Sequence, residues 1–329
     1  MTASEILTAI SELNTLVLGD VCLDRWCIYD PDTAAPSRET GISRVGVVFT
    51  ETTPGAAGTI ANNLVALGVS RVTILGAIGD DGHGFELLRA LRRRRISAEL
   101  SVISSLIPTF TYTKLINSET GMEDLPRIDY IRTEPLPMEV EEELLEKLDS
   151  CIDSFDVVFV SDQAETESGG MVTPEIRRSL SRVALEFPKK VIWVDSRMRP
   201  EHFRNVIIKP NRDEAVAACL RQFGEVDLEK LRSVTESPLL VMTDSDAGVV
   251  IFREGEEILV KTKPEAQPVD ICGAGDSFSA GAATALAVTG DPLLAARFGN
   301  MVASVTIMKK GTGTASPAEV LAAERNWPA

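Results

Sequence analysis

Histidines, cysteine pairs and long apolar runs are scarce in this 329-residue sequence. It has two histidines, His83 and His202, which disfavours mechanisms that need a histidine base or several histidine metal ligands. Its five cysteines are scattered and include no CxxC pair, so neither a disulfide framework nor a zinc site is expected. Unpaired cysteines fit a reducing cytoplasm, which is the expected location. No apolar run approaches the length of a membrane span.

Two nucleotide-binding signatures are also missing. The chain contains no Gly-Lys dipeptide, which excludes a P-loop nucleotide-binding site. No GxGxxG motif follows the first expected strand, and this argues against a dinucleotide-binding fold. Positive charge is in deficit as well, because the formal net charge is −16. A strongly acidic surface repels phosphate backbones, so we expect no nucleic-acid partner.

What the sequence does contain is a succession of strand–helix–strand units. Short apolar runs alternate with longer segments of helical periodicity along most of the chain. This order predicts an α/β fold with a doubly wound, mostly parallel sheet, formed by a single domain over residues 1–329. The strands expected in that sheet lie at residues 15–20, 71–81, 156–162, 190–196, 206–211, 238–244 and 249–252.

Two further segments break this pattern because their apolar residues alternate. Val45, Val47 and Phe49 share one face of the first, and the second alternates on both sides of a Ser-Glu-Thr-Gly turn. We interpret lid segments at about 25–52 and 107–132 as a small antiparallel β lid that projects from the main sheet. Small exposed sheets rarely stand alone, so the apolar face predicts a homodimer through the lid, with packing inside one lid as the alternative.

Polar side chains follow most of the expected strands. Because the carboxyl ends of parallel strands meet at one edge of a sheet, we expect these side chains to surround a ligand site there. Each of them alone could equally cap a helix. The residues are Asp20, Asp24, Asp80, Asp81, Asp162, Asp195, Asn211, Thr243 and Asp270.

The most informative segment is DICGAGDSF, at residues 270–278. Gly273, Ala274 and Gly275 leave the backbone bare just before an expected helix, so their amides can converge on an anion with help from the helix dipole. Asp276 lies at the start of that helix. A carboxylate there would repel a phosphate, which suggests that it removes a proton from a hydroxyl nucleophile; a helix N-cap is its alternative role.

DICGAGDSF resembles the signature of the PfkB/ribokinase family of carbohydrate kinases, usually written DTxGAGDxF. Other segments resemble further motifs of that family, in the same order, from about residue 14 to 325. They are GDVCLD (19–24), PGAAGTIANN (54–63), GDDGHG (79–84), KPNRDEA (209–215), TDSDAG (243–248) and NMVASVTIMKKGTGT (300–314). The segments PRIDY, FVSDQA, VDSR and KKGTGTASP are similar to the heptose-phosphate kinase domain of bifunctional ADP-heptose synthesis enzymes.

The resemblance implies a ribokinase-like enzyme that transfers a phosphoryl group from ATP to a sugar or sugar phosphate. Asp276 would be its general base, and a heptose 7-phosphate-like acceptor is the expected substrate. The residues implied on the ATP side are Asn211, Thr243, Gly248, Asn300 and Ala303. The residues implied at the sugar are Asp20, Asp24, Gly55, Ala56, Thr59 and Asp276. Mg²⁺ would be held through water by Glu214 and Asn211, and Asp270 would be the side-chain ligand of a K⁺ ion where one is used.

Two departures from the family pattern alter the sugar pocket. Ala56 and Thr59 stand where the family usually has glycine and asparagine. A phosphorylated substrate needs a cationic clamp, for which the candidates are Arg25, Arg38, Arg44, Lys114, Arg127 and Arg197. Two alternatives stay open: a PfkB-type kinase of an unphosphorylated sugar or nucleoside, and a non-catalytic sensor of a sugar or nucleotide.

Overall fold

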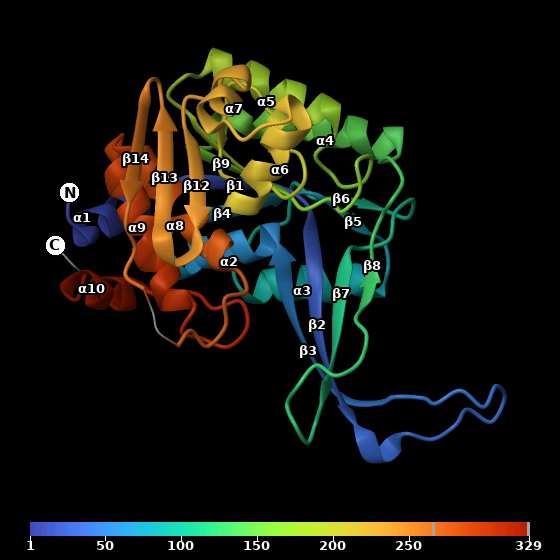
Figure 1. Ribbon diagram of the computed structural model, residues 1–329. Coiled ribbons are helices and arrows are strands. Elements are labelled where there is room, and N and C mark those ends of the chain that lie inside the picture. Colours follow the sequence, from blue (N-terminus) through green and yellow to red (C-terminus); the bar gives the residue numbers. More distant parts are fainter. Residues whose placement is uncertain (265–266, 328–329) are drawn as a thin grey trace.

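The centre of the molecule is an eight-stranded sheet, seen in a computed structural model that describes residues 1–264 and 267–327 (Figure 1). Its order is β14-β13-β12-β11-β10-β9-β1-β4. Neighbouring strands are parallel from β4 to β12, whereas β13 runs antiparallel to both β12 and β14. This confirms the doubly wound, mostly parallel sheet. The strands are β1 (Asn14–Gly19), β4 (Arg71–Leu75), β9 (Val157–Asp162), β10 (Val191–Ser196), β11 (Ile207–Ile208), β12 (Leu240–Asp244), β13 (Gly248–Arg253) and β14 (Glu256–Val260).

Helices cover both faces of this sheet, because alternate side chains of each buried strand point to opposite sides. Val17 of β1 packs into one layer, and Leu16 packs into the other. The first layer holds α1 (Ala3–Ile10), α2 (Ala57–Leu67), α3 (Gly82–Arg93), α8 (Ala274–Thr289), α9 (Pro292–Thr306) and α10 (Pro317–Arg325). The second holds α4 (Met138–Cys151), α5 (Pro174–Glu186), α6 (Arg212–Phe223) and α7 (Leu228–Val234).

Close packing fixes α8, the helix that carries the signature segment. A Cβ added at Gly281 of α8 would lie 2.8 Å from Val302 Cγ2 of α9, so only glycine lets the two helices approach this closely. Most of α8 is buried, and its side chains are small. The start of α8 is therefore held rigidly at the edge of the sheet.

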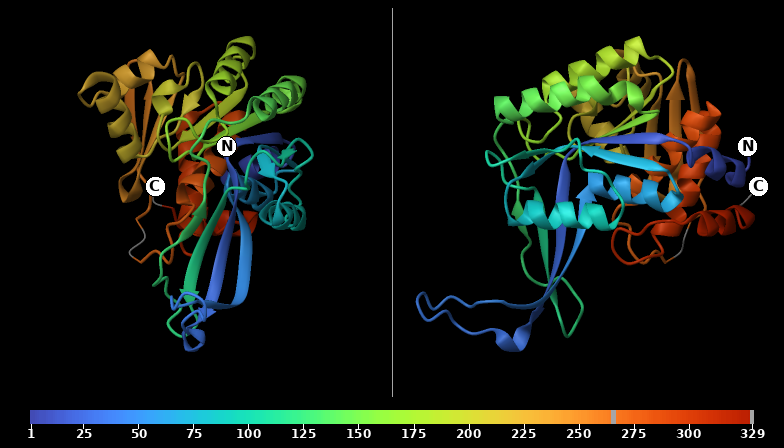
Figure 2. Two further views of the ribbon diagram at one scale, coloured as in Figure 1. Left: turned by 90° about the vertical axis from the view of Figure 1, so that its right-hand side faces the viewer. Right: turned by 180° about the vertical axis from the view of Figure 1, so that it is seen from behind.

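A second, four-stranded sheet projects from the core as the lid (Figures 1 and 2). Its outer pairs, β3/β2 and β7/β8, are antiparallel as expected, but the central pair β2/β7 is parallel. The lid is mixed because β2 and β7 both run outward from the core, with α2 and α3 between them in the chain. Beyond the strands, residues 31–45 extend as an arm (Figure 2). The lid strands are β2 (Val21–Asp30), β3 (Gly46–Ala56), β7 (Thr111–Asn117) and β8 (Ile128–Tyr130).

Some element boundaries differ from the expected ones. Strand β2 begins at Val21, so Asp24 lies inside a strand rather than in a loop. Helix α2 begins only at Ala57, because Gly55 and Ala56 still pair with β2. The sequence pattern does not reveal β14, an edge strand that opens with two exposed glutamates.

Shorter elements complete the described chain. Strands β5 (Ala77–Gly79) and β6 (Val102–Ser104) form a separate parallel pair. Single-turn 3-10 helices lie at Pro31–Thr33, Ile152–Ser154, Pro200–His202 and Ser245–Ala247. Within residues 1–264 and 267–327, no helix combines the length and apolar character needed to cross a membrane.

Candidate active site

Helix α8 begins with a bare backbone turn. Gly273 is its N-cap and has a φ of 77°, a left-handed conformation that glycine adopts without strain. A Cβ at Gly273 would lie 3.2 Å from Thr59 Cγ2 and 3.3 Å from Thr312 Cγ2. Segments from α2 and from the loop after α9 therefore enclose this turn on two sides.

The free amides of this turn are fewer than the sequence suggests. The Ala274 amide donates to Ile271 O at 3.2 Å inside the loop. Gly275 and Asp276 follow in the first helical turn, where backbone amides have no acceptor within the helix and can bind an anion. Because Gly273 holds the N-cap position, the Asp276 side chain is not the cap of this helix.

The Asp276 carboxyl lies half-buried in the wall of a cavity of about 210 Å³. Burial is the main cause that raises the pKa of Asp276 to about 7; the charge of Asp195 adds to the increase and the ammonium of Lys209 opposes it. A base with a pKa near the working pH is well matched to removing a proton from a hydroxyl. The structure thus places a carboxyl with a raised pKa in the cavity wall at the start of α8.

Lys209 belongs to this site although sequence reasoning did not single it out. Its side chain is 3% exposed, and its Nζ lies 2.5 Å from Asp195 Oδ2. A Cβ at Gly275 would lie 3.3 Å from the same Nζ, so the ammonium rests against the first turn of α8. The sequence does offer one signal for Lys209, which is a lysine directly after a short apolar strand. A lysine buried at such a place nearly always has a charged partner, so it points to a nearby carboxylate. Lys209 therefore adds a fixed positive charge beside the anion-binding amides.

One side of the cavity is built from β2, β3 and α2. Of the expected sugar contacts, Asp24, Ala56 and Thr59 line it together with Asp276. Gly55 lies behind Asp24: a Cβ there would come 2.4 Å from Asp24 Oδ2. Glycine at this position thus makes room for the Asp24 carboxylate. Burial raises the pKa of Asp24 to about 6.

Ala56 has an unusual backbone conformation for a residue with a side chain. Its φ is 52° and its ψ is −118°, a region that glycine favours and alanine enters only with strain. Its methyl group faces the cavity, where the usual family glycine would leave more room. The departure noted in the sequence therefore affects both pocket shape and local stability.

Asp20 does not lie in the cavity wall, contrary to expectation. It is 2% exposed, its Oδ2 accepts from the Gln163 amide at 2.8 Å and its Oδ1 from the Met171 amide at 2.7 Å. Burial, followed by the charge of Asp162, raises the pKa of Asp20 to about 7. Since backbone donors occupy both oxygens, Asp20 supports a loop beside the cavity rather than facing a sugar.

Four of the six clamp candidates line the same cavity. They are Arg25, Lys114, Arg127 and Arg197, which come from separate parts of the chain. Arg38 and Arg44 lie on the arm and outside the cavity. The cavity therefore combines three carboxylates, Asp24, Glu165 and Asp276, with four cationic side chains.

These cations have acidic neighbours that leave donors available. Lys114 Nζ lies 3.7 Å from Glu123 Oε2, longer than a hydrogen bond. Arg127 donates through Nε and Nη2 to one oxygen of Asp129, at 2.9 and 2.6 Å. Lys114 and Arg127 can therefore bind an incoming anion without breaking a buried ion pair.

The residues expected on the ATP side lie at the ends of neighbouring elements. Asn211 and Thr243 pair across a parallel bridge, and Gly248 opens the next strand. Asn300 and Ala303 lie on α9, and Asn300 is 5% exposed. Its Nδ2 is buried without a hydrogen-bond partner among the described residues.

Asn211 and Glu214 form a capping box at the start of α6. Asn211 Oδ1 accepts from the Glu214 amide at 2.9 Å, and Glu214 Oε2 accepts from the Asn211 amide at 2.8 Å. Burial, followed by the charge of Asp195, raises the pKa of Glu214. In the part of the chain that the structure describes, no three His, Cys, Asp or Glu side chains are grouped to hold a metal ion.

Asp270 ties two loops together at the opposite side of the α8 turn. Its Oδ1 accepts from the Cys272 amide at 2.9 Å, and its Oδ2 accepts from the Gly311 amide at 3.0 Å. The segment before α8 and the segment after α9 are thereby held next to each other.

Comparison with known proteins decides the family. The model of the "pfkB family carbohydrate kinase" matches residues 17–319. The chain belongs to the pfkB family of carbohydrate kinases. It is therefore an ATP-dependent carbohydrate kinase.

The bifunctional protein HldE of Trichlorobacter lovleyi is 32% identical over 325 residues, which cover 95% of this chain and 63% of that protein. HldE of Geobacter sulfurreducens is 29% identical, over 94% of this chain and 62% of that protein. The chain thus spans less than two thirds of these relatives.

Solved structures show the same fold. Phosphofructokinase-2 from Escherichia coli, in complex with potassium, matches with a TM-score of 0.71 and 17% identity, over 95% of this chain and 99% of that one. Ribokinase from Thermotoga maritima matches with a TM-score of 0.68 and 19% identity, over 95% and 100% of the two chains. The pfkB kinase described here therefore has the ribokinase-like fold that its sequence motifs imply.

Proposed function

We propose that this kinase phosphorylates a hydroxyl group of a sugar phosphate, with Asp276 as the general base. The observation that carries the proposal is the position of Asp276, whose carboxyl lines the cavity next to the free amides of the α8 turn. A general base must come within hydrogen-bond distance of the hydroxyl that it deprotonates. A sugar bound between Asp24 and Asp276 meets that requirement.

The chemistry follows from these neighbours. The acceptor hydroxyl gives its proton to Asp276 while its oxygen bonds to the γ-phosphorus of ATP, and the bond from that phosphorus to the β,γ-bridging oxygen breaks to release ADP. Negative charge on the transferred group is offset by the amides of Gly275 and Asp276 and by the ammonium of Lys209. Asp24 accepts hydrogen bonds from sugar hydroxyls and so orients the nucleophile.

Two kinds of cation fit the ATP side. Glu214 and Asn211 suit an outer role toward Mg²⁺, because the capping box occupies Glu214 Oε2 and leaves Oε1 for a metal-bound water. Asp270 would hold K⁺ only through the lone pairs that remain on its two oxygens, because each oxygen already accepts from a backbone amide. When bound, these ions supply positive charge that lowers the repulsion between the phosphates and the surrounding carboxylates.

The cationic wall of the cavity supports a phosphorylated acceptor. Arg25, Lys114, Arg127 and Arg197 bring four cationic side chains to one cavity, and a phosphate group on the acceptor would give them an anion to bind. A heptose 7-phosphate is our first candidate, because segments such as PRIDY and VDSR resemble the heptose-phosphate kinase domain. Of these, PRIDY contributes Arg127 and VDSR contributes Arg197 to the cavity.

ADP release from Mg-ATP tests this proposal with matched pairs of acceptors. We would compare heptose 7-phosphate with heptose, fructose 6-phosphate with fructose, and both with a nucleoside. We expect the phosphorylated member of a pair to be preferred by about tenfold or more, as one lost charge-assisted contact costs at least that much. Preference for a free sugar or nucleoside would refute the phosphate part and keep the kinase, whereas binding of ATP without any turnover would support the sensor alternative.

A substitution in the clamp makes the same test residue by residue. Lys114→Gln should raise the KM for the sugar phosphate and leave the KM for the matching free sugar unchanged. Arg38→Gln is the control, because it removes a similar charge from the arm, outside the cavity. Equal effects of Lys114→Gln on both acceptors would mean that Lys114 does not bind the phosphate.

A homodimer through the lid is a further part of the proposal. Strand β3 forms an edge of the lid, and Val47, Val48 and Phe49 on it are 47%, 60% and 58% exposed. Apolar edge strands of this kind are normally covered. Light scattering of the purified chain should give twice the monomer mass, and Phe49→Lys should give a monomer; a monomeric parent chain would contradict the proposal.

A further inference from the structure

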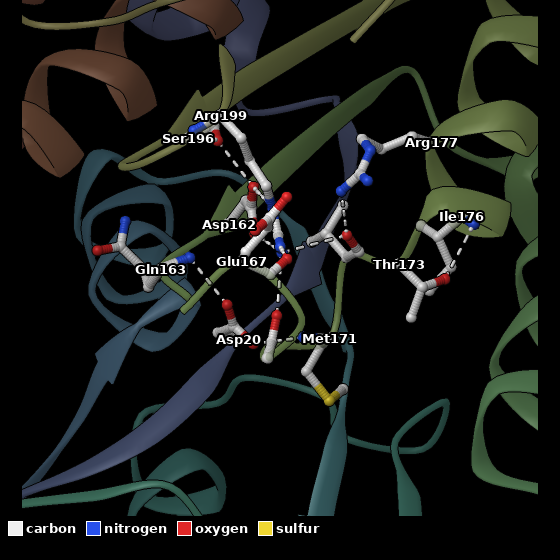
Figure 3. Close-up of polar contacts among 12 residues, drawn as sticks. Asp20, Asp162, Gln163, Glu167, Met171, Thr173, Ile176, Arg177, Ser196 and Arg199 are labelled. Atoms are coloured by element: carbon white, nitrogen blue, oxygen red, sulfur yellow. Dashed lines mark hydrogen bonds and ion pairs between the residues drawn. The ribbon is translucent and has the colours of Figure 1, made fainter. Parts of the chain in front are cut away.

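Arg199 is a buried cation that the chemistry above does not use. It is 6% exposed and follows β10, and its partner Asp162 is 1% exposed at the end of β9. Arg199 Nε donates to Asp162 Oδ2 at 3.0 Å and Nη2 donates to Oδ1 at 2.8 Å, a two-pronged ion pair (Figure 3). Ser196 Oγ adds a third bond to Asp162 Oδ2 at 2.7 Å. This fully satisfied pair holds the guanidinium in one orientation.

The rest of the guanidinium binds the backbone of the loop between β9 and α5. Arg199 Nη1 donates to Glu167 O at 2.6 Å, and Nη2 donates to Gly169 O at 3.1 Å and to Val172 O at 3.4 Å. The loop spans residues 163–173, and Figure 3 shows Arg199 beside Asp162 and Glu167. Arg199 therefore gathers carbonyls that are separated along the chain.

Asp20 holds the same loop from its other side. Its two oxygens bind the amides of Gln163 and Met171, which lie near the two ends of the loop (Figure 3). Arg199 thus donates hydrogen bonds to carbonyls of the loop, and Asp20 accepts hydrogen bonds from its amides. Together they fix an irregular segment that has neither helix nor strand of its own.

This loop forms part of the sugar cavity. Gln163 and Glu165 line the cavity, although the anchors that hold them do not. Glu165 Oε1 accepts from Tyr112 Oη of the lid strand β7 at 3.3 Å, and it lies 3.5 Å from Arg197 Nη1. The loop therefore joins the core to the lid at the point where the sugar binds.

We propose that Arg199 is a positioning residue for sugar binding, acting through the loop that presents Gln163 and Glu165 to the cavity. This inference rests on the proposed function, because it takes the cavity beside Asp276 to be the sugar site. A buried ion pair is by itself weak support for stability, as its desolvation cost offsets much of its attraction. The ion pair between Asp162 and Arg199 instead has a role in orienting the guanidinium that holds the loop carbonyls.

The variant Asp162→Leu/Arg199→Met removes both charges and leaves neither one buried alone. We expect the amides of Gln163, Gly169 and Met171, which donate hydrogen bonds in the parent, to exchange faster in this variant while β1 and β9 stay protected. We expect the KM for the sugar phosphate to rise by about tenfold or more, with kcat and the KM for ATP within about threefold of the parent, because a displaced wall misplaces the sugar. Asp20→Asn, which weakens the other anchor, should shift the same parameter in the same direction.

Glu201→Leu/Arg221→Met is the matched control, because it also removes both charges of a pair with a buried carboxylate. Arg221 also pairs with a buried carboxylate, Glu201, at 2.6 Å, but it does not bind the loop. Unchanged loop protection in the Asp162→Leu/Arg199→Met variant would overturn the inference. A fall in kcat together with equal rises in the KM for ATP and the KM for the sugar phosphate would also overturn it, because a general loss of stability explains that pattern. The exchange measurement needs no turnover. A parent chain that phosphorylates nothing would contradict the proposed function, and the exchange of the loop amides would still show whether Arg199 fixes the loop.

Discussion

Asp276→Asn should abolish catalysis and stabilise the fold at the same time. Burial raises the pKa of Asp276 from 3.8 to about 7, a difference of about 3 units. At about 1.4 kcal/mol for each unit, a charged Asp276 would cost the folded protein about 4 kcal/mol. The carboxyl is half-buried and faces an open cavity, where water screens the charge. We therefore expect Asp276→Asn to raise the free energy of unfolding by about 2 kcal/mol.

The gain should depend on pH in a defined direction. Because the pKa is higher in the folded state, the protonated carboxyl stabilises the fold fully below the unfolded value of 3.8, and this contribution is lost as pH rises through about 7. Asparagine resembles the protonated acid at every pH. The stability difference between the two proteins should therefore be small near pH 4 and fully developed above pH 7.

Urea unfolding of both proteins at pH 4.5, 6 and 8 measures this difference. The raised pKa of Asp20 affects both proteins equally, so it cancels in the comparison. We expect the free energy of unfolding of the asparagine variant to exceed that of the parent by an amount that grows at each step. The interpretation is that burial makes the charged form of Asp276 unfavourable in the folded protein. An asparagine variant that is less stable than the parent at pH 8, or a stability difference that is constant with pH, would refute it.

Three further predictions follow from the same site. Ala56→Gly should relieve the strain at a φ of 52° and raise stability by about 1 kcal/mol, seen as a rise of about 2 °C in calorimetric Tm; no rise would mean that the strain is absent. Gly55→Ala should push aside the Asp24 carboxylate and lower kcat/KM for the sugar by about tenfold or more at unchanged KM for ATP, and an effect on ATP instead would contradict this. kcat/KM should rise about tenfold for each pH unit up to about 7 and then level off, whereas a flat profile would exclude Asp276 as the titrating base.

The start of α8 is the part of the site that local sequence reveals best. Gly273 and Gly275 leave a bare turn, and the residues around Asp276 have helical periodicity, so position and chemistry are both encoded within a few residues. The parallel order of the main sheet is equally local, because each strand–helix–strand unit sets its own direction. The parallel pairing of β2 with β7 is not local, since it depends on how the chain between them crosses the core.

The loop beside the cavity could not be predicted for the same reason. Its residues show no periodicity, and its shape is set by Asp20, more than a hundred residues earlier in the chain, and by Arg199, which follows a later strand. Asp20 carries the sequence signature of a ligand residue, yet its two oxygens bind backbone amides. Only the three-dimensional structure separates a carboxylate that lines the cavity, such as Asp24, from one that supports the wall behind it.

Turnover of the parent chain and of Asp276→Asn, measured side by side with Mg-ATP and the best acceptor sugar phosphate, tests the account at its core. Removing a general base should lower kcat by about 10³-fold, while the asparagine variant should bind ATP as the parent does and stay folded. Loss of turnover with ATP binding retained is the result that we predict. An asparagine variant that keeps its turnover within tenfold of the parent would show that another group removes the proton.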